Sequence, residues 1–388
     1  MNDVFRHTLV HPMGSEARPL PFGKKDAQWN PEMVLTCRRL IAAYKATMLQ
    51  ESRLKQITDD DLWSALMRDN LGQMFSLIHA GDAEQLSRYL VDFGKEYTWF
   101  GGITTGIDGY TYWDRDEQFV AYSYFDKLLC LGEALGVLSV ESPEQGTDGK
   151  WGKNSLQDPD EIVDAIEAQL GIRIIPPEGP VHVAGLKIRG GLLHYRHINA
   201  LYLATRIRDI AAPEDRICEF GGGLGLAAFY LSRMGRKDVT IFDLPIVNLL
   251  SGYFLIGTLG QEAVCLEGEP SRRDAIKLRA NWNCTNEADD AFRVTANQDS
   301  FPEINRRIFD EYVQQIKRIT SGFFLSINHE GEQLIAGGAR LLHVSKLLGA
   351  DRSFVRTYRS PYWLRRGYVE ELYRIESGTS AGTADQPA

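Results

Sequence analysis

The stretch Ile217–Leu231, ICEFGGGLGLAAFYL, places four glycines between a short apolar run and a second apolar segment with helical spacing. A strand, a glycine-rich turn and a helix in this order form a common nucleotide-binding unit of α/β proteins. One acidic residue, Glu219, stands just ahead of the glycines. The stretch therefore predicts a sheet with a nucleotide-type ligand at the end of one strand.

The spacing of the glycines distinguishes two kinds of nucleotide site. The dinucleotide pattern G-x-G-x-x-G needs a glycine at position 226, where the chain has Leu226. The pattern acid-x-Gly-x-Gly-x-Gly is matched by Glu219, Gly221, Gly223 and Gly225. A pyrophosphate binds N–H groups at a helix N-terminus and is repelled by a carboxylate, whereas the ammonium group of a methionine-type ligand is attracted to one. We therefore expect S-adenosylmethionine (SAM) in place of NAD.

A second acidic residue follows the next predicted strand, in the sequence TIFDLP. Asp243 at this strand end can accept hydrogen bonds from both hydroxyl groups of a ribose, and Leu244 after it is expected at the same cofactor. Because SAM and NAD both contain a ribose, Asp243 does not distinguish between them. Glu219 beside the glycines is the residue that favours SAM.

Predicted strands and helices alternate from about His194 onward. Strands are expected over 216–220, 238–245, 275–282, 292–298, 322–330, 352–360 and 368–375, and helices over 195–212, 224–235, 246–260, 304–320 and 334–349. This alternation predicts an α/β fold: a Rossmann-like, mostly parallel sheet covered by helices, with ligands at the carboxyl ends of the strands. The last two strands have little helix between them, which favours an antiparallel C-terminal edge.

The first half of the chain has a different pattern. Residues 31–51 and 60–81 repeat apolar residues with helical spacing, and residues 97–125 are rich in aromatic residues separated by glycines. Those rings either fill a core or form a wall that stacks on a sugar or a nucleobase. We expect a mainly helical and aromatic substrate domain over 1–185, which could also form a homodimer interface. A SAM-binding domain is expected over 186–376 and a disordered tail over 377–388.

The composition narrows the classes of function. The 388-residue chain has a formal net charge of -9, which argues against general binding of nucleic acid or of an anionic membrane surface. No apolar run is long enough to span a membrane, and the N-terminus has no signal-peptide pattern. The five cysteines are odd in number and widely spaced. We therefore expect buried, reduced thiols in a cytoplasmic protein that acts on a small molecule.

Four segments, taken together, resemble one known family. CEFGGGLG, FDLP, ANQDSFPEI and LSINHEG, in this order, are similar to a bacterial family described as sugar O-methyltransferases, which belongs to the class I SAM-dependent methyltransferases. The resemblance extends from about Tyr97 to Glu330. It implies that Asn297 and Gln298 lie near the methionine or sulfonium end of SAM, and Ala280–Trp282 is a looser candidate for the adenine. The other residues that it implies around the cofactor are Glu219, Gly221, Gly223, Gly225 and Asp243.

Transfer of a methyl group to a hydroxyl needs alignment of two atoms and removal of one proton, so we expect a base at a strand end. His329, followed by Glu330, ends the fifth predicted strand and has a suitable ordinary pKa. Asp299 and Glu303, in QDSFPE, are the other candidates. Asp299 could instead cap the next helix, and Glu303 could be an acid of its first turn. The catalytic residue is therefore expected among His329, Asp299 and Glu303.

A third polar group, in the sequence HYRH, precedes the expected cofactor domain. It contains His194, Arg196 and His197, of which Arg196 could bind a phosphate or a carboxylate of the substrate. With Glu330, these three are the candidates for substrate binding. No acidic pair such as D-x-D stands at a strand end, so no metal is expected. The remaining histidines have no supporting neighbours in the sequence and are expected to be structural or on the surface: His7, His11, His79, His182 and His343.

These features predict a SAM-dependent O-methyltransferase that acts on a hydroxyl of a sugar or of a sugar-containing small molecule. An acceptor of another kind, such as a phenol, a carboxylate or an N–O group of a specialised metabolite, fits the aromatic segment nearly as well. An NAD-dependent oxidoreductase is a further interpretation, and Leu226 and Glu219 argue against it. The last alternative is a SAM-binding protein without catalysis, which the polar residues at the strand ends disfavour.

Overall fold

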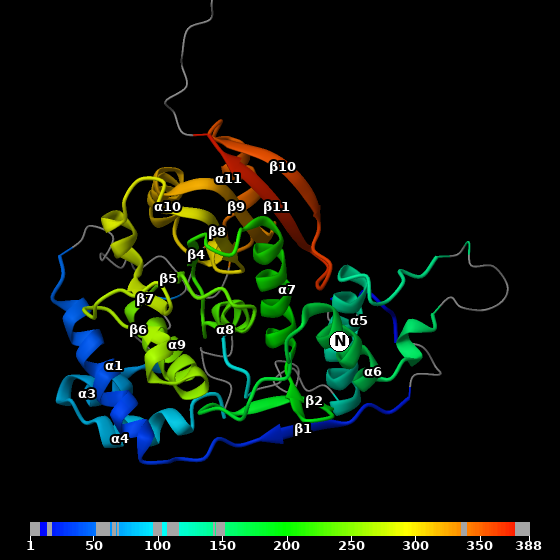
Figure 1. Ribbon diagram of the computed structural model, residues 1–388, viewed down its shortest axis with the longest axis horizontal. Helices are drawn as coiled ribbons and strands as arrows, with labels where there is room; N and C mark the ends of the chain where they lie inside the picture. The colour runs from blue at the N-terminus through cyan, green and yellow to red at the C-terminus, as the bar shows by residue number, and fades with distance from the viewer. Residues whose placement is uncertain are drawn as a thin grey trace, which may run out of the picture.

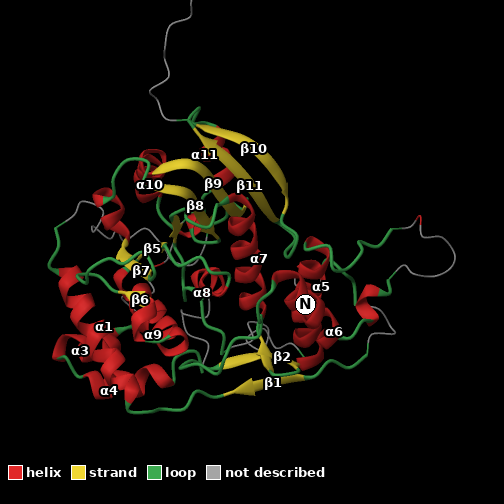
Figure 2. Ribbon diagram, viewed as in Figure 1, coloured by secondary structure: helices red, strands yellow, loops and turns green. Residues whose placement is uncertain are grey.

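The computed structural model describes residues 8–13, 18–51, 63, 67, 70–95, 103–106, 116–142, 144, 152–334 and 340–376. Within these residues, one large sheet from the C-terminal half carries helices on both faces (Figure 1). A smaller sheet and further helices, from the N-terminal half, lie beside it (Figure 2). The functional regions expected from the sequence belong mainly to the large sheet.

The large sheet has the strand order β10-β11-β9-β8-β4-β5-β7-β6. Its strands are β4 (Ile217–Phe220), β5 (Val239–Asp243), β6 (Val264–Cys265), β7 (Ile276–Ala280), β8 (Phe292–Gln298), β9 (Thr320–His329), β10 (Phe354–Pro361) and β11 (Tyr368–Ile375). Neighbouring strands from β9 to β6 are parallel, and β11 is antiparallel to both β9 and β10. The expected α/β fold, with a mostly parallel sheet and an antiparallel C-terminal edge, is confirmed; the two-residue strand β6 was not expected.

Strand β4 lies in the middle of the sheet and is the point from which the chain winds in both directions. The spatial order β7-β5-β4-β8-β9 corresponds to 3-2-1-4-5 in a doubly wound sheet, so the order reverses between β4 and β8. In such sheets ligands bind outside the carboxyl ends of the strands at this reversal. The glycine turn that follows β4 lies at this place, and so does the QDSFPE segment that follows β8.

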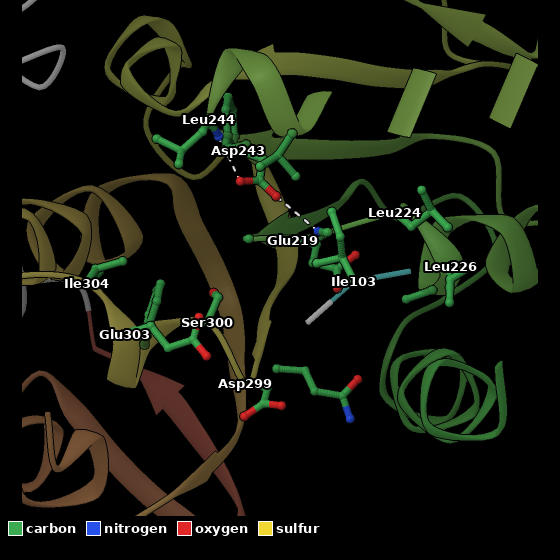
Figure 3. A pocket seen from close by; sticks show the side chains of 18 of the residues that line it. Ile103, Glu219, Leu224, Leu226, Asp243, Leu244, Asp299, Ser300, Glu303 and Ile304 are labelled. Atoms are coloured by element: carbon green, nitrogen blue, oxygen red, sulfur yellow. Dashed lines mark hydrogen bonds between the residues drawn. The ribbon is translucent and has the colours of Figure 1, made fainter. Parts of the chain in front are cut away.

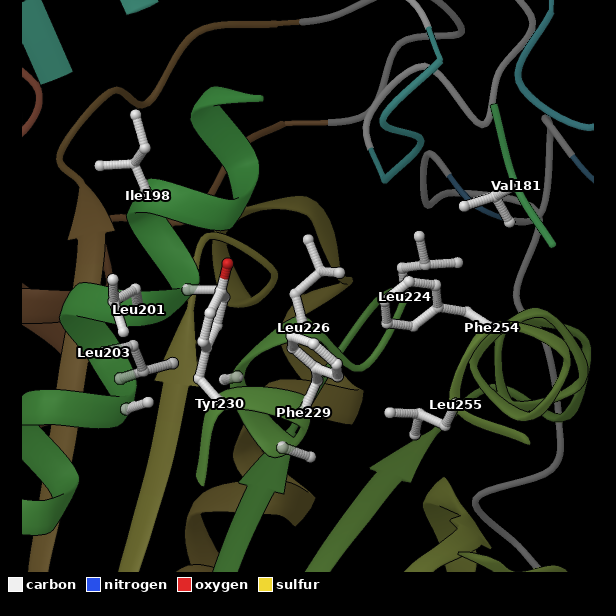
Figure 4. Packing of buried hydrophobic residues seen from close by; sticks show 14 of the residues in the cluster. Val181, Ile198, Leu201, Leu203, Leu224, Leu226, Phe229, Tyr230, Phe254 and Leu255 are labelled. Carbon is white, nitrogen blue, oxygen red and sulfur yellow. The ribbon is translucent and has the colours of Figure 1, made fainter. Parts of the chain in front are cut away.

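The alternation of side chains in β4 divides the interior into two cores. Ile217 belongs to the core under α7 (Tyr195–Ile210), α8 (Leu226–Arg233) and α9 (Pro245–Leu259). Cys218 and Phe220 belong to the second core, under α10 (Arg306–Ile319) and α11 (Val344–Gly349). Figure 4 shows the first core, where Leu201 of α7, Phe229 of α8 and Phe254 of α9 converge. Both faces of β4 are therefore covered, as its apolar sequence requires.

The N-terminal half is mainly helical. Its helices are α1 (Glu32–Met48), α3 (Gly72–Ala80), α4 (Ala83–Val91), α5 (Glu117–Ala134) and α6 (Pro159–Leu170). Its small antiparallel sheet has the order β1-β2-β3, formed by β1 (Phe22–Lys25), β2 (Val183–Ile188) and β3 (Gly191–Leu193). The expected boundary between residues 185 and 186 falls inside β2.

Helix α1 packs on α9, which joins the N-terminal half to the large sheet. The hydroxyl of Tyr253 in α9 donates a hydrogen bond to the sulfur of Met33 at 3.4 Å. The Nε atom of Arg39 lies 2.6 Å from a carboxylate oxygen of Glu269. The helices that sequence analysis assigned to a substrate domain thus share packing with the predicted cofactor domain.

The aromatic segment is partly explained by packing. Phe119, Tyr122, Tyr124 and Phe125 are buried in α5 and belong to the core. The other six rings of the expected aromatic wall lie outside the described residues: Tyr97, Trp99, Phe100, Tyr110, Tyr112 and Trp113. The tail expected over 377–388 also lies outside them. The four rings in α5 therefore fill the core, which is the first of the two interpretations given for the aromatic segment.

The helix expected over 334–349 is much shorter in the structure. Leu334 pairs with Arg340 in an isolated antiparallel bridge, and α11 begins only at Val344. His343 caps it, since its side chain accepts a hydrogen bond from the backbone N–H of Lys346. The two consecutive glycines at 337 and 338 lower helix propensity, which explains why apolar spacing alone was misleading here.

All five cysteines are free and buried, as expected from their spacing: Cys37, Cys130, Cys218, Cys265 and Cys284. No helix among the described residues combines the length and the apolar character that a membrane crossing requires.

Candidate cofactor and acceptor site

A pocket opens at the carboxyl ends of β4, β5 and β8 (Figure 3). The residues expected from the sequence divide into two sets around it. Those that line the pocket are Arg196, Glu219, Gly221, Gly223, Asp243, Leu244, Gln298, Asp299 and Glu303. Those that do not are His194, His197, Gly225, Asn297, His329 and Glu330.

The turn after β4 has a conformation that only glycine adopts easily. Gly221, Gly223 and Gly225 have φ values of 72°, 57° and 80°. A Cβ atom on Gly221 would lie 2.0 Å from the hydroxyl oxygen of Ser300, so this glycine permits the close approach of two loops at the pocket. On Gly225 it would lie 2.8 Å from a methyl carbon of Leu255. Gly225 therefore permits the close packing of α8 on α9, and it lies outside the pocket lining.

Glu219 lines the pocket and is buried. The residue is 5% exposed, and its Oε2 atom has no hydrogen-bond partner among the described residues. Burial, together with the nearby carboxylate of Asp243, raises the pKa of Glu219 to about 8. A buried carboxylate is costly unless a cation or a donor compensates it. The position therefore suits a positively charged group of a ligand.

Asp243 is held over the glycine turn by two backbone groups (dashed lines in Figure 3). Its Oδ2 atom accepts a hydrogen bond from the N–H of Gly223 at 3.0 Å, and its Oδ1 atom accepts one from the N–H of Leu244 at 2.7 Å. Burial raises the pKa of Asp243 to about 7, although these two hydrogen bonds oppose the change. The carboxyl group is thus fixed at the end of β5, where it can accept from ligand hydroxyls.

The first residue of η8 (Asn281–Asn286) offers a polar contact beyond β5. Asn281 lines the pocket together with Leu244. It is 3% exposed, and its Oδ1 atom has no hydrogen-bond partner within the described part of the chain. Trp282 does not line the pocket, since its indole N–H donates to the side-chain oxygen of Gln50 at 2.8 Å. Of the expected adenine segment Ala280–Trp282, only Asn281 reaches the pocket.

The two polar residues that end β8 have different roles. Asn297 is fully buried, and its Nδ2 atom donates to the carbonyl oxygen of Phe220 at 2.9 Å and to the hydroxyl of Ser300 at 2.6 Å. It therefore ties the end of β8 to the end of β4, and the structure gives it no direct place in the pocket. Gln298 does line the pocket, and its Nε2 atom donates to the hydroxyl of Tyr362 at 3.2 Å.

The hairpin between β10 and β11 brings three side chains to the pocket that sequence analysis did not identify: Tyr362, Arg365 and Tyr368. The hydroxyl of Tyr368 donates to Asp299 Oδ1 at 2.7 Å, and the guanidinium of Arg365 lies 3.6 Å from Asp299 Oδ2. Asp299 itself has a positive φ of 66°, which is uncommon for a residue other than glycine. The only feature of the sequence that could have indicated these three residues is a polar and aromatic turn between the last two predicted strands. The position of this turn beside the pocket depends on the pairing of β11 with β9.

Glu303 occupies the end of η9 (Phe301–Glu303), next to Asp299 in the pocket. Burial and the charge of Asp299 raise the pKa of Glu303 to about 8, against a hydrogen bond from Trp63 and the positive charges of Arg196 and Arg365. A carboxyl group with a pKa near neutrality can accept a proton efficiently. Of the three expected catalytic residues, Glu303 thus has the most suitable surroundings.

His329 and Glu330 lie at the end of β9 but outside the pocket lining. The Nδ1 atom of His329 accepts a hydrogen bond from the N–H of Gly331 at 3.1 Å, and burial lowers the pKa of the imidazole. Both carboxylate oxygens of Glu330 accept hydrogen bonds from Arg359, at 2.9 and 3.0 Å. The antiparallel β11 inserts beside β9 and places Tyr368, in place of His329, at the pocket.

His194 and His197, expected to bind substrate, are buried outside the pocket lining and contact other residues of the protein. His194 is fully buried; its Nδ1 atom accepts from the N–H of Arg196 at 3.1 Å, and its Nε2 atom lies 3.0 Å from the hydroxyl of Tyr124. His197 lies 3.2 Å, through Nδ1, from the hydroxyl of Tyr230. Burial lowers the pKa of His197 to about 3, so this imidazole remains neutral.

His11, for which the sequence showed no supporting neighbours, lies in a polar cluster away from the pocket. Its Nδ1 atom is 3.0 Å from Asp126 and its Nε2 atom is 2.9 Å from Glu133. Ligand-type atoms of His11, Asp126 and Cys130 lie within 4.8 Å of one another, which is close enough for a metal. However, Lys127 also contacts Asp126, at 2.8 Å. Two cations, Lys127 and a protonated His11, already balance the two carboxylates.

No family model and no curated protein matches the chain. Among solved structures, geranyl diphosphate C-methyltransferase from Streptomyces coelicolor A3(2), determined with Mg2+, geranyl diphosphate and S-adenosyl-L-homocysteine, is 12% identical over 47% of this chain and 81% of its own, with a TM-score of 0.37. The [4+2]-cyclase SpnF is 13% identical over 48% and 84%, with a TM-score of 0.37. The YcgJ protein of Bacillus subtilis is 11% identical over 46% and 98%, with a TM-score of 0.35. At this level the likeness concerns the fold alone, and the function is argued from the pocket.

Proposed function

We propose that the chain is a SAM-dependent O-methyltransferase that acts on a small molecule. The observation that carries the proposal is the buried Oε2 atom of Glu219, without a hydrogen-bond partner among the described residues, beside the glycine turn. A Cβ atom on Gly222 would lie 3.2 Å from this oxygen, so the turn keeps open the space that faces it. A pyrophosphate would be repelled by this carboxylate, whereas the ammonium group of SAM would be attracted.

The other residues of the pocket fit the remaining parts of SAM. Asp243 would accept hydrogen bonds from the ribose hydroxyls, Asn281 Oδ1 would accept one from the adenine amino group, and Leu244 would contact the adenine ring. These assignments use acceptors at the carboxyl ends of β5 and β7, the half-buried Asp243 and the buried Asn281. When bound, SAM supplies a methyl group on a positively charged sulfur that leaves as a neutral thioether.

Glu303 is the base that we propose for the acceptor hydroxyl. Its ionised carboxylate would take the hydroxyl proton while the acceptor oxygen forms its bond to the methyl carbon. Burial and the charge of Asp299 raise the pKa of Glu303 to about 8, which makes this carboxylate a stronger base than an exposed one. Asp299 is engaged by Tyr368 and Arg365, and we assign it to positioning.

Our proposal for the class of acceptor molecule is based on the family resemblance and on the composition of the chain. A hydroxyl of a sugar or of a sugar-containing small molecule is the proposal, and a phenol, a carboxylate or an N–O group of another metabolite is the alternative. We further propose a cytoplasmic enzyme whose N-terminal half contributes acceptor contacts and a homodimer interface. Trp63 and Met67, which line the pocket, support such acceptor contacts.

Calorimetry with SAM, S-adenosylhomocysteine and NAD tests the cofactor. We expect both adenosyl compounds to bind and NAD not to bind, because Glu219 would repel the pyrophosphate. Binding of NAD alone would overturn the proposal. Transfer of a radiolabelled methyl group to matched panels of sugars and phenols then identifies the acceptor class.

The base is tested with Glu303→Gln, and His329→Gln is the matched control at a strand end outside the pocket lining. We expect Glu303→Gln to lower turnover about 100-fold or more while S-adenosylhomocysteine still binds. Wild-type turnover should rise with pH up to about 8, as Glu303 loses its proton. If only the His329 variant lost turnover, the base assignment would be wrong, although the methyltransferase assignment would stand.

A further inference from the structure

We propose that Asn328 is a positioning residue for the ligand of the pocket. Acting through Asn297, it fixes the end of β8 against the glycine turn that follows β4. Asn328 itself lies outside the pocket lining, so it affects the ligand only through other residues. This inference rests on the proposed function, because its test measures the binding of an adenosyl compound at that turn.

Three buried polar side chains form a continuous chain of hydrogen bonds across β9 and β8. Ser326, Asn328 and Asn297 are 2%, 1% and 0% exposed. The Nδ2 atom of Asn328 donates to Asn297 Oδ1 and to Ser326 Oγ, both at 2.9 Å. Asn297 Nδ2 continues the chain to the carbonyl oxygen of Phe220 in β4. The chain thus links three neighbouring strands whose carboxyl ends border the pocket.

The direction of this chain is set by one backbone group. The carbonyl oxygen of Phe220 can only accept, so Asn297 turns its Nδ2 atom toward β4 and its Oδ1 atom toward β9. Asn328 must then present its own Nδ2 atom to Asn297, and its Oδ1 atom has no hydrogen-bond partner within the described part of the chain. A buried oxygen without a partner destabilises the folded protein. Stability alone therefore does not account for an amide at this position.

Asn297 connects the chain of hydrogen bonds to the two loops that border the pocket. Its Nδ2 atom also donates to Ser300 Oγ at 2.6 Å, and both Ser300 and Gly221 line the pocket. A Cβ atom on Gly221 would lie 2.0 Å from Ser300 Oγ and 3.8 Å from Asn297 Nδ2. A displacement of the Asn297 amide therefore moves the border of the pocket at the glycine turn.

The test measures the affinity of the full-length protein for S-adenosylhomocysteine by calorimetry, with thermal unfolding recorded for each variant. We expect Asn328→Ala to weaken binding about 5- to 10-fold, because Asn297 loses the hydrogen bond that orients its amide. Asn297→Ala should weaken binding at least as much. The double variant should bind no more weakly than Asn297→Ala alone, since Asn328 acts through Asn297.

Thr295→Val is the matched control. Thr295 is a fully buried residue of β8 outside the pocket lining, and its hydroxyl lies 2.6 Å from that of Thr320 in β9. The substitution keeps the shape of the side chain and removes a buried polar contact between the same two strands. It should lower the unfolding temperature and leave the affinity unchanged. Asn328→Ser, a smaller change, provides the same comparison if the alanine variant does not fold.

The outcomes separate this inference from the proposed function. If the wild-type protein does not bind S-adenosylhomocysteine, the proposed function fails and this inference fails with it. If the wild type binds and the Asn328 variants bind equally well, only the present inference is overturned. Additive losses in the double variant would also overturn it, because Asn328 would then act by another route. An equal loss of affinity in Thr295→Val would do the same, since any buried polar contact between these strands would then have this effect.

Discussion

At the scale of single residues, Glu219 and Asp243 place two carboxyl groups at the ends of adjacent strands of the sheet. Burial raises the pKa of both, and the charge of Asp243 raises that of Glu219 further, to about 8. An acid whose pKa is raised in the folded state binds its proton more tightly there than in the unfolded chain. The stability of the free protein should therefore fall as the pH rises from about 4.5 through 8.

Glu219→Gln should remove the attraction for the ammonium group of SAM and keep the shape of the side chain. We expect the affinity for S-adenosylhomocysteine to fall roughly 10- to 150-fold, because a hydrogen bond to a charged group is lost. The free variant should be at least as stable as the wild type at pH 8, since its amide does not ionise. Calorimetry and thermal unfolding measure the two effects.

Glu370→Gln is the matched control for this prediction. Glu370 is also buried, but Arg206 pairs with it at 2.7 Å, and it lies outside the pocket lining. This control should lose stability and keep its affinity for S-adenosylhomocysteine. Unchanged affinity in Glu219→Gln would contradict the assignment of that carboxylate to the ligand.

At the scale of elements, the unit of β4, the glycine turn and α8 has a geometry set by its backbone. Gly221, directly after β4, and Gly235, just beyond the end of α8, have φ values of 72° and 81°. The positions differ in their surroundings. A Cβ atom on Gly221 would meet Ser300, whereas a Cβ atom on Gly235 would have no described atom within 4 Å. Substitution of Gly235 therefore tests backbone strain alone, whereas substitution of Gly221 adds a steric clash at the pocket.

Gly221→Ala should lower both stability and the affinity for S-adenosylhomocysteine. Gly235→Ala should lose only about 1–2 kcal/mol of unfolding free energy, from the left-handed conformation of its backbone. Gly221→Ala should lose more than this, because Ser300 and the end of β8 must also move. Urea unfolding and calorimetry of both variants measure the difference. Equal losses with retained affinity would show that the close approach of the two loops is not needed for the ligand.

At the scale of the whole molecule, residues 8–13 near the N-terminus contact both α5 and the hairpin between β10 and β11. Asp126 in α5 accepts hydrogen bonds from the backbone N–H groups of Val10 and His11, and the carbonyl of Val10 accepts one from Arg366 at 3.4 Å. Burial alone would lower the pKa of His11, but the hydrogen bonds to Asp126 and Glu133 raise it to about 12. A charged imidazole therefore anchors this segment.

His11→Gln should lower the unfolding free energy by about 3–5 kcal/mol at pH 6, because it leaves buried carboxylates without their partner. The pKa of His11 is raised on folding, so its contribution is complete below about pH 6.5. It then declines as the pH rises from about 6.5 toward the raised pKa of about 12. The difference from wild type should thus be smaller at pH 9 than at pH 6, as measured by chemical unfolding.

The exposed His79 provides the control for the His11 prediction. His79→Gln should leave the unfolding free energy nearly unchanged at both pH values. A difference between wild type and His11→Gln that did not shrink with pH would exclude a charged imidazole as the anchor.

The sequence by itself determined the features that depend on local spacing. Alternating apolar strands and helices predicted the parallel sheet, and the glycines after Glu219 predicted the turn, because backbone conformation and side-chain periodicity are properties of neighbouring residues. Asp243, Leu244, Gln298 and Asp299 were predicted near the pocket for the same reason: each ends or directly follows a strand, and the carboxyl ends of parallel strands share one edge. Glu303 was predicted with them because it follows the end of β8 in the same segment.

Only the tertiary structure decided which polar residues meet at the pocket. The pairing of β11 with β9 brings Tyr362, Arg365 and Tyr368 to Asp299 and leaves His329 outside the lining. The burial of His194 turns a candidate ligand contact into a support for Arg196. These outcomes depend on strand order, register and burial, which are set by contacts between residues far apart in the chain and are therefore not encoded in local spacing.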